Sequence, residues 1–272
     1  MRETSAQELN GWPFVRFKLR IDLIRFLMGI GYERAIEYPW VFRELQVEPA
    51  HRVMDIGSGT SIFPLFVQAT TGATVHCMDF DQSLLRLEGY ARKAGLGAAL
   101  HQEKLVIRQF DSFPLPYPDG YFDRLSCIST IEHSPNDSDT ACMLELIRLV
   151  KPGGRLVLSV PIAERHKDVY VTSDVYNRKF GGEAIFYERH YDRTSLHERL
   201  IGPSGATLLS LDAFGEPGFE FGRRIAFKPW IGVEGALRPF RWALPAVAHR
   251  LIKRVALEAP PLRSFCCFAL RK

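Results

Sequence analysis

The sequence predicts a doubly wound α/β fold, and three observations indicate it. Short apolar segments that resemble strands alternate with helical segments between residues 51 and 161. Each apolar segment is almost wholly hydrophobic, which is typical of parallel strands buried on both faces. The first of them ends in a glycine-rich turn, Gly57–Ser58–Gly59, and in this fold class such a turn faces a ligand at the carboxyl edge of the sheet. We therefore expect a seven-stranded, mostly parallel sheet with an N-terminal helical segment and insertions before strands six and seven.

The expected elements follow one another along the chain. Strands are expected at 51–56, 74–81, 104–111, 121–130, 155–161, 205–214 and 263–272. Helices are expected at 61–72, 82–95, 138–150 and 193–201, with Pro64 in a first turn, where proline is tolerated. Residues 1–46 are predicted to form a helical cap. Residues 47–272 are predicted to form one domain with inserted substrate or lid segments at 162–200 and 215–262.

Composition limits the class of protein. The chain has 272 residues, a net charge of +4 and five cysteines, whose odd number and spacing fit neither a zinc site nor a disulfide framework. We expect free, buried thiols in a reducing compartment. The N-terminus does not resemble a secretory signal, and no apolar run is long enough to span a membrane, so we expect a cytoplasmic protein.

The glycine turn carries an acid that dinucleotide-binding turns do not need. Asp55 stands two residues before Gly57, and Ile62 occupies the place of the third glycine of the dinucleotide fingerprint. A carboxylate here would repel a pyrophosphate, which argues against the alternative of a nicotinamide-dependent oxidoreductase. It suits a cofactor that is positively charged near the turn. S-adenosylmethionine carries a sulfonium and an ammonium and has no phosphate.

Two further acids follow the next two strands. Asp79 ends the second strand, where a carboxylate can accept hydrogen bonds from both hydroxyls of a ribose. Asp111 ends the third strand, where it can accept a hydrogen bond from an adenine amino group. Taken singly, Asp55 could merely cap the turn and Asp79 could be a solvated acid. Together the three acids predict one continuous cofactor edge.

Five segments between residues 53 and 161 carry a family resemblance: VMDIGSGTS, VHCMDFD, FDSFPLPYPDGYFD, STIEH and LVKPGGRLVLSVP. In this order they resemble the class I S-adenosylmethionine-dependent methyltransferases, in particular the broad group that includes the ubiquinone/menaquinone-biosynthesis methyltransferases. The resemblance implies a Rossmann-like methyltransferase fold that binds S-adenosylmethionine and releases S-adenosylhomocysteine. Ser61 departs from the family's usual third glycine, which affects the expected shape of the turn.

The resemblance also implies roles for individual residues. The methionine end of the cofactor would be held by the turn, the ribose by the end of strand two, and the adenine by the end of strand three. The cofactor-binding residues are then Asp55, Gly57, Ser58, Gly59, Asp79, Phe80, Asp111 and Ser112, with Ser129 beside the methionine and the transferred methyl.

Methyl transfer requires a positioned, desolvated acceptor, and it requires a base only if the acceptor atom is protonated. His133, in the STIEH segment after strand four, is the leading candidate, because the pKa of an unperturbed histidine suits proton transfer at neutral pH. His190 is the second candidate, and Tyr187 and Tyr191 beside it could line an acceptor pocket. Alternatively, His133 holds a loop and the aromatic residues close a hydrophobic lid.

These features predict methyl transfer to a small molecule, at a hydroxyl oxygen of a sugar or another secondary metabolite. N- or C-methylation, a lipid-linked acceptor at a membrane surface and a non-catalytic cofactor-binding module are the alternatives. No cluster has metal-ligand spacing, so no metal is expected. The segment after strand four lacks the motif with which amino-methylating DNA enzymes hold a flipped base, so no nucleic acid is expected.

The C-terminal part of the chain is strongly basic, since residues 221–272 contain 11 Lys and Arg against 2 Asp and Glu. Residues 223–254 combine these cations with tryptophan and phenylalanine, a composition typical of segments that lie on membranes. Three prolines argue against one long helix. We favour a cover over the substrate pocket and keep peripheral membrane contact as the alternative. The oligomeric state is not predicted.

Overall fold

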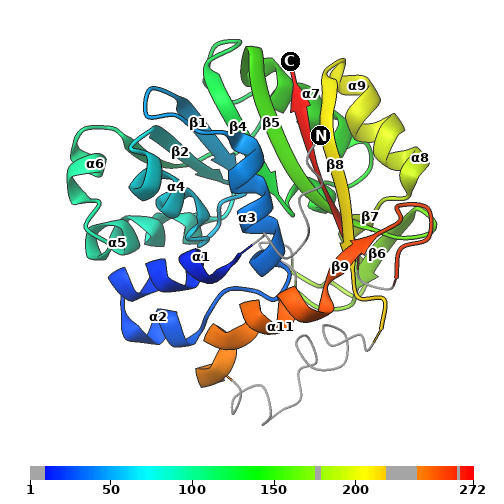
Figure 1. Ribbon diagram of the computed structural model, residues 1–272. Helices are drawn as coiled ribbons and strands as arrows, with labels where there is room; N and C mark the ends of the chain where they lie inside the picture. Colours follow the sequence, from blue (N-terminus) through cyan, green and yellow to red (C-terminus); the bar gives the residue numbers. More distant parts are fainter. Residues whose placement is uncertain (1–9, 175–178, 219–237, 262–263) are drawn as a thin grey trace.

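The computed structural model describes residues 10–174, 179–218, 238–261 and 264–272 (Figure 1). These residues form a central sheet of eight strands in the order β3-β2-β1-β4-β5-β10-β8-β9. The first five are parallel, and β10 runs antiparallel between β5 and β8. The doubly wound α/β prediction is confirmed, with eight strands instead of seven because a short edge strand pairs with β8. The strands of this sheet are β1 (Arg52–Ile56), β2 (Thr74–Asp79), β3 (Leu105–Gln109), β4 (Phe122–Ile128), β5 (Val150–Ile162), β8 (Thr207–Gly215), β9 (Lys253–Val255) and β10 (Ser264–Arg271).

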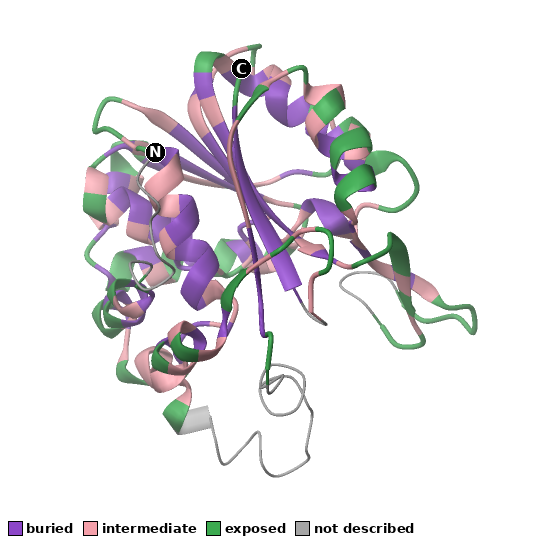
Figure 2. Cartoon of the chain, turned by 45° about the vertical axis from the view of Figure 1, so that its right-hand side comes forward, coloured by how far each residue is buried: buried purple, intermediate pink, exposed green. Residues whose placement is uncertain are grey.

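Helices cover both faces of the sheet, and each face has its own hydrophobic core (Figure 2). Cys266 belongs to one core and Cys267 to the other, as neighbours on a strand should. All five cysteines are buried and free. On the first face lie α1 (Trp12–Phe17), α3 (Arg34–Leu45), α4 (Phe63–Thr71), α5 (Arg86–Lys93) and α6 (Gly97–His101), and on the second lie α7 (Ser138–Leu149), α8 (Arg193–Leu196), the π-helix η5 (His197–Ile201) and α9 (Gly202–Ser204).

The N-terminal helices and the C-terminal insertion pack together. The 3₁₀ turn η2 (Lys18–Arg20) and helix α2 (Leu23–Leu27) join α1 to α3. The insertion contributes η7 (Arg238–Ala243) and α11 (Leu244–Leu251), and the Trp242 ring lies 5.9 Å from the Trp12 ring and 6.1 Å from the Phe26 ring, measured between centroids. The described part of the basic segment therefore buries aromatic surface against the N-terminal helices. Residues 223–237 of that segment lie outside the described residues.

The structure differs from the expected elements at several points. Strand β3 ends at Gln109, two residues before Asp111, and prolines at 114 and 116, which lack the N–H that a ladder needs, follow closely. The segment 162–200 contains an antiparallel hairpin, β6 (Lys167–Val171) and β7 (Ile185–His190), that we did not predict. None of the helices in the described ranges is both long enough and apolar enough to cross a membrane.

Candidate cofactor and acceptor site

The carboxyl ends of β1, β2 and β4 lie side by side at one edge of the sheet. Ile56 at the end of β1 pairs with Met78 on β2 and with Cys127 on β4. The three segments that follow these strands therefore leave the sheet at the same level. This is the place where doubly wound sheets bind ligands, because the strand order reverses at β1 and β4.

Asp55 lies beneath the glycine turn. Its side chain is buried, and its two carboxylate oxygens accept hydrogen bonds from the hydroxyls of Ser58 at 2.7 Å and Ser126 at 2.6 Å. Burial raises the pKa of Asp55 to about 6, although both hydrogen bonds act in the opposite direction. Asp55 thus ties the turn to β4 and places a negative charge below it at neutral pH.

The two glycines of the turn have different surroundings. Both have positive φ, +74° at Gly57 and +47° at Gly59, which glycine adopts without strain. A Cβ on Gly57 would lie 2.1 Å from Oγ1 of Thr130, so the backbone there is pressed against the segment after β4. A Cβ on Gly59 would find its nearest neighbour, Oδ2 of Asp79, at 3.8 Å. Gly59 therefore presents an open backbone surface that a ligand can approach.

Asp79 connects the ends of β1 and β2. Its Oδ2 accepts a hydrogen bond from the Gly59 N–H at 2.7 Å, and its Oδ1 accepts one from the Asp81 N–H at 2.8 Å. The side chain is half-buried, and burial raises its pKa. A carboxylate has about four acceptor positions, so two remain after these bonds. Both hydroxyls of a ribose can use them.

An aromatic surface continues this edge toward β3. Phe80 is 47% exposed, and its ring centroid lies 4.0 Å from that of Phe110 and 5.7 Å from that of Phe113. Asp111 and Ser112 are exposed beside these rings. A flat, partly apolar wall with a neighbouring carboxylate suits an adenine ring, which needs a stacking surface and a hydrogen-bond acceptor.

Ser129 belongs to a buried network that the sequence did not predict. Its hydroxyl accepts a hydrogen bond from Nη1 of Arg34 at 2.7 Å and donates one to Oε1 of Glu37 at 2.8 Å. The Ser159 hydroxyl also donates to Glu37, at 2.7 Å, and Arg34 forms an ion pair with the same carboxylate. Glu37 is only 1% exposed. Helix α3 is thereby fixed over the ends of β4 and β5.

The same helix explains Ser61, which stands where the family usually has glycine. The Ser61 hydroxyl lies 2.8 Å from the hydroxyl of Tyr38 and accepts a hydrogen bond from the Phe63 N–H at the start of α4. A glycine would lose both contacts. The sequence signal for this role was the polar set Arg34, Glu37 and Tyr38, spaced so that one face of a helix carries all three.

His133 lies against the β6–β7 hairpin. Its Nδ1 is 2.7 Å from the carbonyl oxygen of Tyr187, and the two rings are 5.2 Å apart. A neutral ring with this partner must donate from Nδ1, which leaves the lone pair on Nε2. The structure therefore brings together two of the residues expected for the acceptor side, His133 and Tyr187.

The other two residues on the acceptor side are placed differently. Nε2 of His190 lies 2.7 Å from Oε1 of Glu188, so this histidine has a carboxylate partner that the sequence did not reveal. Tyr191 is fully buried, and its hydroxyl donates to Oδ2 of Asp139 at 2.9 Å. The structure thus places Tyr191 in the core between α7 and β7 and not on a pocket surface.

Comparisons with known proteins fit this geometry. Residues 54–158 match the family described as "Methyltransferase domain". The chain is 27% identical over 172 residues to the methyltransferase GfsG of Streptomyces halstedii, and the matched region covers 63% of this chain and 58% of that protein. It is also 27% identical over 194 residues to the ubiquinone/menaquinone biosynthesis C-methyltransferase UbiE of Cupriavidus pinatubonensis, and this match covers 65% of this chain and 76% of that protein.

A solved structure shares the fold. The [4+2]-cyclase SpnF has a TM-score of 0.56 and 17% sequence identity, and the match covers 90% of this chain and 84% of that one. At this identity the likeness concerns the fold alone. The first curated relative, GfsG, is matched over less than two thirds of its length.

Proposed function

We infer from these findings that the chain is a class I S-adenosylmethionine-dependent methyltransferase, and we propose that it methylates a small molecule. The observation that carries the proposal is the glycine turn. Its backbone is open to a ligand at Gly59, and the Gly59 N–H donates a hydrogen bond to Asp79, the acid proposed to bind the ribose. Residues 54–158, which match the methyltransferase domain, contain this turn and the ends of β1 to β4. Residues 1–46 are proposed to act as a cap over this site, and the hairpin within 162–200 as part of the acceptor pocket.

The residues of the site fit the cofactor. We propose that Asp55, Gly57, Ser58 and Gly59 shape the turn around the methionine end and that Asp79 holds the ribose. Phe80, Asp111 and Ser112 are proposed to border the adenine. Ser129 is proposed to lie beside the methionine and the transferred methyl, and its hydrogen bond to Glu37 links this position to α3. When bound, S-adenosylmethionine supplies a methyl group that is already activated by the sulfonium. The chain's own task is to position the acceptor and to exclude water.

For a hydroxyl acceptor, His133 is the base we propose. The carbonyl of Tyr187 fixes its tautomer, and η4 (Ile131–His133) directly follows the end of β4. Nε2 of His133 would accept the proton of the acceptor hydroxyl. His190 with Glu188 is the second candidate. N- and C-methylation are the alternatives, and the acceptor class, a sugar or another secondary metabolite, is part of the proposal.

Two measurements test this function. Calorimetry should detect S-adenosylhomocysteine binding by the wild type, and Asp79→Ala should weaken it, because Ala loses every acceptor that Asp79 presents. Ser83→Ala, which leaves Asp79 and its hydrogen bonds to Gly59 and Asp81 in place, is the control. Release of S-adenosylhomocysteine with a panel of metabolites then measures turnover. Cofactor binding with no turnover on a broad panel would favour a cofactor-binding module without methyltransferase activity.

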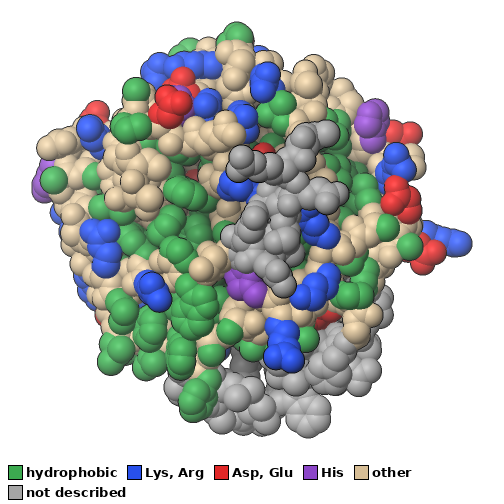
Figure 3. Space-filling view, in the orientation of Figure 1, with side chains coloured by type: hydrophobic (Ala, Val, Ile, Leu, Met, Phe, Trp, Pro, Cys, Tyr) green, Lys and Arg blue, Asp and Glu red, His purple; other side chains and the backbone are tan. Residues whose placement is uncertain are grey.

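Contact with a membrane surface is a second candidate, because apolar side chains gather on one part of the face in Figure 3. The large exposed ones on the N-terminal helices and η7 are Leu19, Leu23, Ile24, Met28 and Phe240. Arg16 and Arg20 are exposed on the same helices. We propose that this patch meets anionic lipid. Wild-type protein should float with anionic vesicles at low salt, and Ile24→Glu should abolish flotation. The control Leu208→Glu, on β8, should float as the wild type does. Failure of the wild type to float would exclude the contact.

A further inference from the structure

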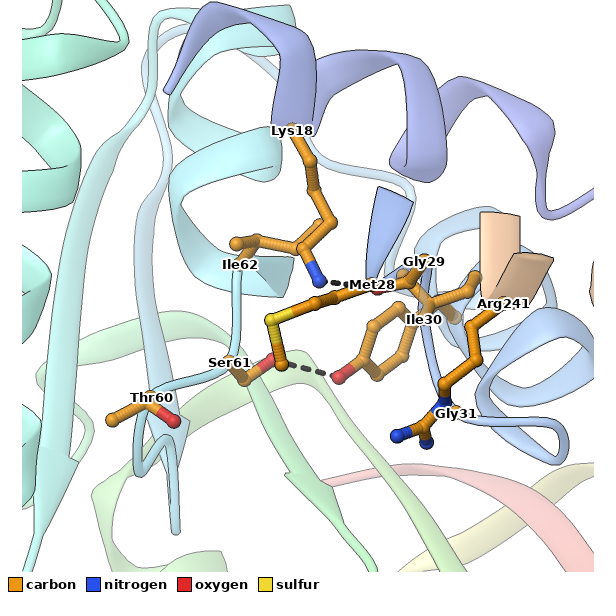
Figure 4. Close-up of a pocket in the computed structure, with 10 residues that line it drawn as sticks. Lys18, Met28, Gly29, Ile30, Gly31, Thr60, Ser61, Ile62 and Arg241 are labelled. Carbon is orange, nitrogen blue, oxygen red and sulfur yellow. Dashed lines mark hydrogen bonds between the residues drawn. The ribbon is translucent and has the colours of Figure 1, made fainter. Parts of the chain in front are cut away.

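A cavity of about 340 Å³ lies between the N-terminal helices and the residues that follow the glycine turn (Figure 4). Lys18 and Met28 line it from the N-terminal segment, Ser61 and Ile62 from the residues just before α4, and Arg241 from η7. Volumes from about 300 Å³ upward are typical of small-ligand sites. The cavity is therefore large enough for part of a small molecule next to the proposed methionine end of the cofactor.

Positive charge dominates this cavity. Lys18 and Arg241 line it, and among the described residues no Asp or Glu does. Nζ of Lys18 donates a hydrogen bond to the carbonyl of Gly29, which is a neutral acceptor. Burial and the nearby Arg25 and Arg241 lower the pKa of Lys18 to about 8, whereas Asp22 acts in the opposite direction. Cations held in a cavity without a facing carboxylate carry an electrostatic cost that an anionic ligand offsets.

The rest of the wall offers one hydroxyl pair and an apolar surface. The hydroxyls of Tyr38 and Ser61 are 2.8 Å apart and can turn a donor toward a ligand. Met28, Ile30 and Ile62 supply the apolar part. The nine-residue helix α4 begins at this wall, and the positive end of its dipole adds to the charge of the two cations. The cavity thus combines anion recognition at one end with apolar packing at the other.

We propose that this cavity binds an anionic group of the methyl acceptor, a carboxylate or a phosphate, between Lys18 and Arg241, while the apolar body of the acceptor packs on Met28, Ile30 and Ile62. The inference rests on the proposed function and narrows the acceptor to anionic small molecules. The cavity is larger than one carboxylate requires, which favours the acceptor over the carboxylate of the cofactor's own methionine. The experiment below distinguishes an anionic group of the acceptor from the carboxylate of the cofactor's methionine.

The test uses the full-length protein and inorganic phosphate and acetate as probes, with and without saturating S-adenosylhomocysteine. Calorimetry should show phosphate binding by the wild type, weakened at least tenfold in Lys18→Met and in Arg241→Met. Lys18→Arg keeps the charge and should retain most of the affinity. Lys104→Met, which removes an exposed lysine far along the chain, should behave as the wild type. Circular dichroism checks that each variant is folded.

The outcomes separate the possibilities. Unchanged S-adenosylhomocysteine affinity together with weakened phosphate binding in Lys18→Met and Arg241→Met supports an acceptor site. A tenfold loss of S-adenosylhomocysteine affinity in both would assign the cations to the cofactor's carboxylate and overturn the inference. Equal phosphate binding by these variants and Lys104→Met would also overturn it. If the wild type does not bind S-adenosylhomocysteine, the proposed function fails, and the phosphate titration of the free protein still decides whether the cavity binds anions.

The pH dependence provides a second readout. Sulfate keeps its charge between pH 7 and pH 9.5, so only the protein titrates in that range. The affinity of sulfate for the wild type should fall as the pH rises past about 8, because Lys18 then loses its proton and its positive charge. The charged groups that act on Lys18 are Arg25, Arg241 and Asp22. Lys18→Arg should remove the decline, and a decline that persists in this variant would contradict the role of Lys18.

Discussion

Replacing Gly57 by alanine tests how tightly the glycine turn is held by the segment after β4. An alanine at φ +74° costs about 1–2 kcal/mol in backbone strain. Its Cβ would also lie 2.1 Å from Oγ1, 2.2 Å from Cγ2 and 2.5 Å from Cβ of Thr130, all closer than real contacts allow. Relieving such an overlap costs about a further 1–3 kcal/mol. Gly57→Ala should therefore lower the free energy of unfolding by about 2–5 kcal/mol.

Gly72 provides a matched control. Its φ is +71°, almost that of Gly57, but a Cβ there would have no neighbour within 4 Å. Gly72→Ala should cost only the strain, about 1–2 kcal/mol. Urea denaturation measures both values, and Thr130→Gly should recover the part of the Gly57→Ala loss that is due to overlap. Equal losses in Gly57→Ala and Gly72→Ala, or no recovery with Thr130→Gly, would refute the reasoning.

Three further predictions concern the buried charges and the proposed base. Asp55→Asn should gain stability relative to the wild type as the pH rises from 4 to 7. Folding raises the pKa of Asp55 from 3.8 to about 6, so the free energy of unfolding of the wild type falls by up to about 3 kcal/mol over this range, whereas that of the variant lacks this decrease. Urea denaturation at both pH values measures this change, and a constant difference between the two proteins would contradict the prediction. Arg34→Met should lower the free energy of unfolding by about 2–4 kcal/mol, because it removes the ion-pair partner of the buried Glu37. Adding Glu37→Gln should restore most of this loss in thermal or urea unfolding, and no restoration would speak against the ion pair. His133→Ala should lower kcat by about 10²–10⁴-fold with S-adenosylhomocysteine affinity intact, whereas wild-type turnover would remove it as the base.

The sequence predicted the parts of the fold that depend on local pattern. The apolar runs ending in Ile56, Asp79 and Ile128 identified β1, β2 and β4, because parallel strands buried on both faces need continuous hydrophobic residues. The hairpin of β6 and β7 was missed, since its strands are partly exposed and polar and lack that pattern. Strand β3 was extended too far, to Asp111, because an acid after an apolar run resembles a strand end.

The ends of neighbouring strands could be assigned from the sequence alone, because the register of a parallel sheet brings them to one edge. Asp79 beside the glycine turn follows from this rule, and the hydrogen bond from Gly59 agrees with it. The partners of each charge could not be assigned, since they come from segments far apart in the chain. The Ser126 hydroxyl donates a hydrogen bond to Asp55, 71 positions away in the chain, and the Ser129 hydroxyl donates one to Glu37, 92 positions away.

The sequence by itself determined the fold class, the glycine turn and the order of the acids near the ends of consecutive strands, because each of these depends on residues that are neighbours in the chain or on consecutive strands. Only the tertiary structure decided which side chains meet over that edge. Helix α3 brings Tyr38 to Ser61, and η2 and η7 bring Lys18 and Arg241 to one cavity although more than half of the chain separates them. Packing of the N-terminal helices against the C-terminal insertion, which no local pattern specifies, is the physical reason.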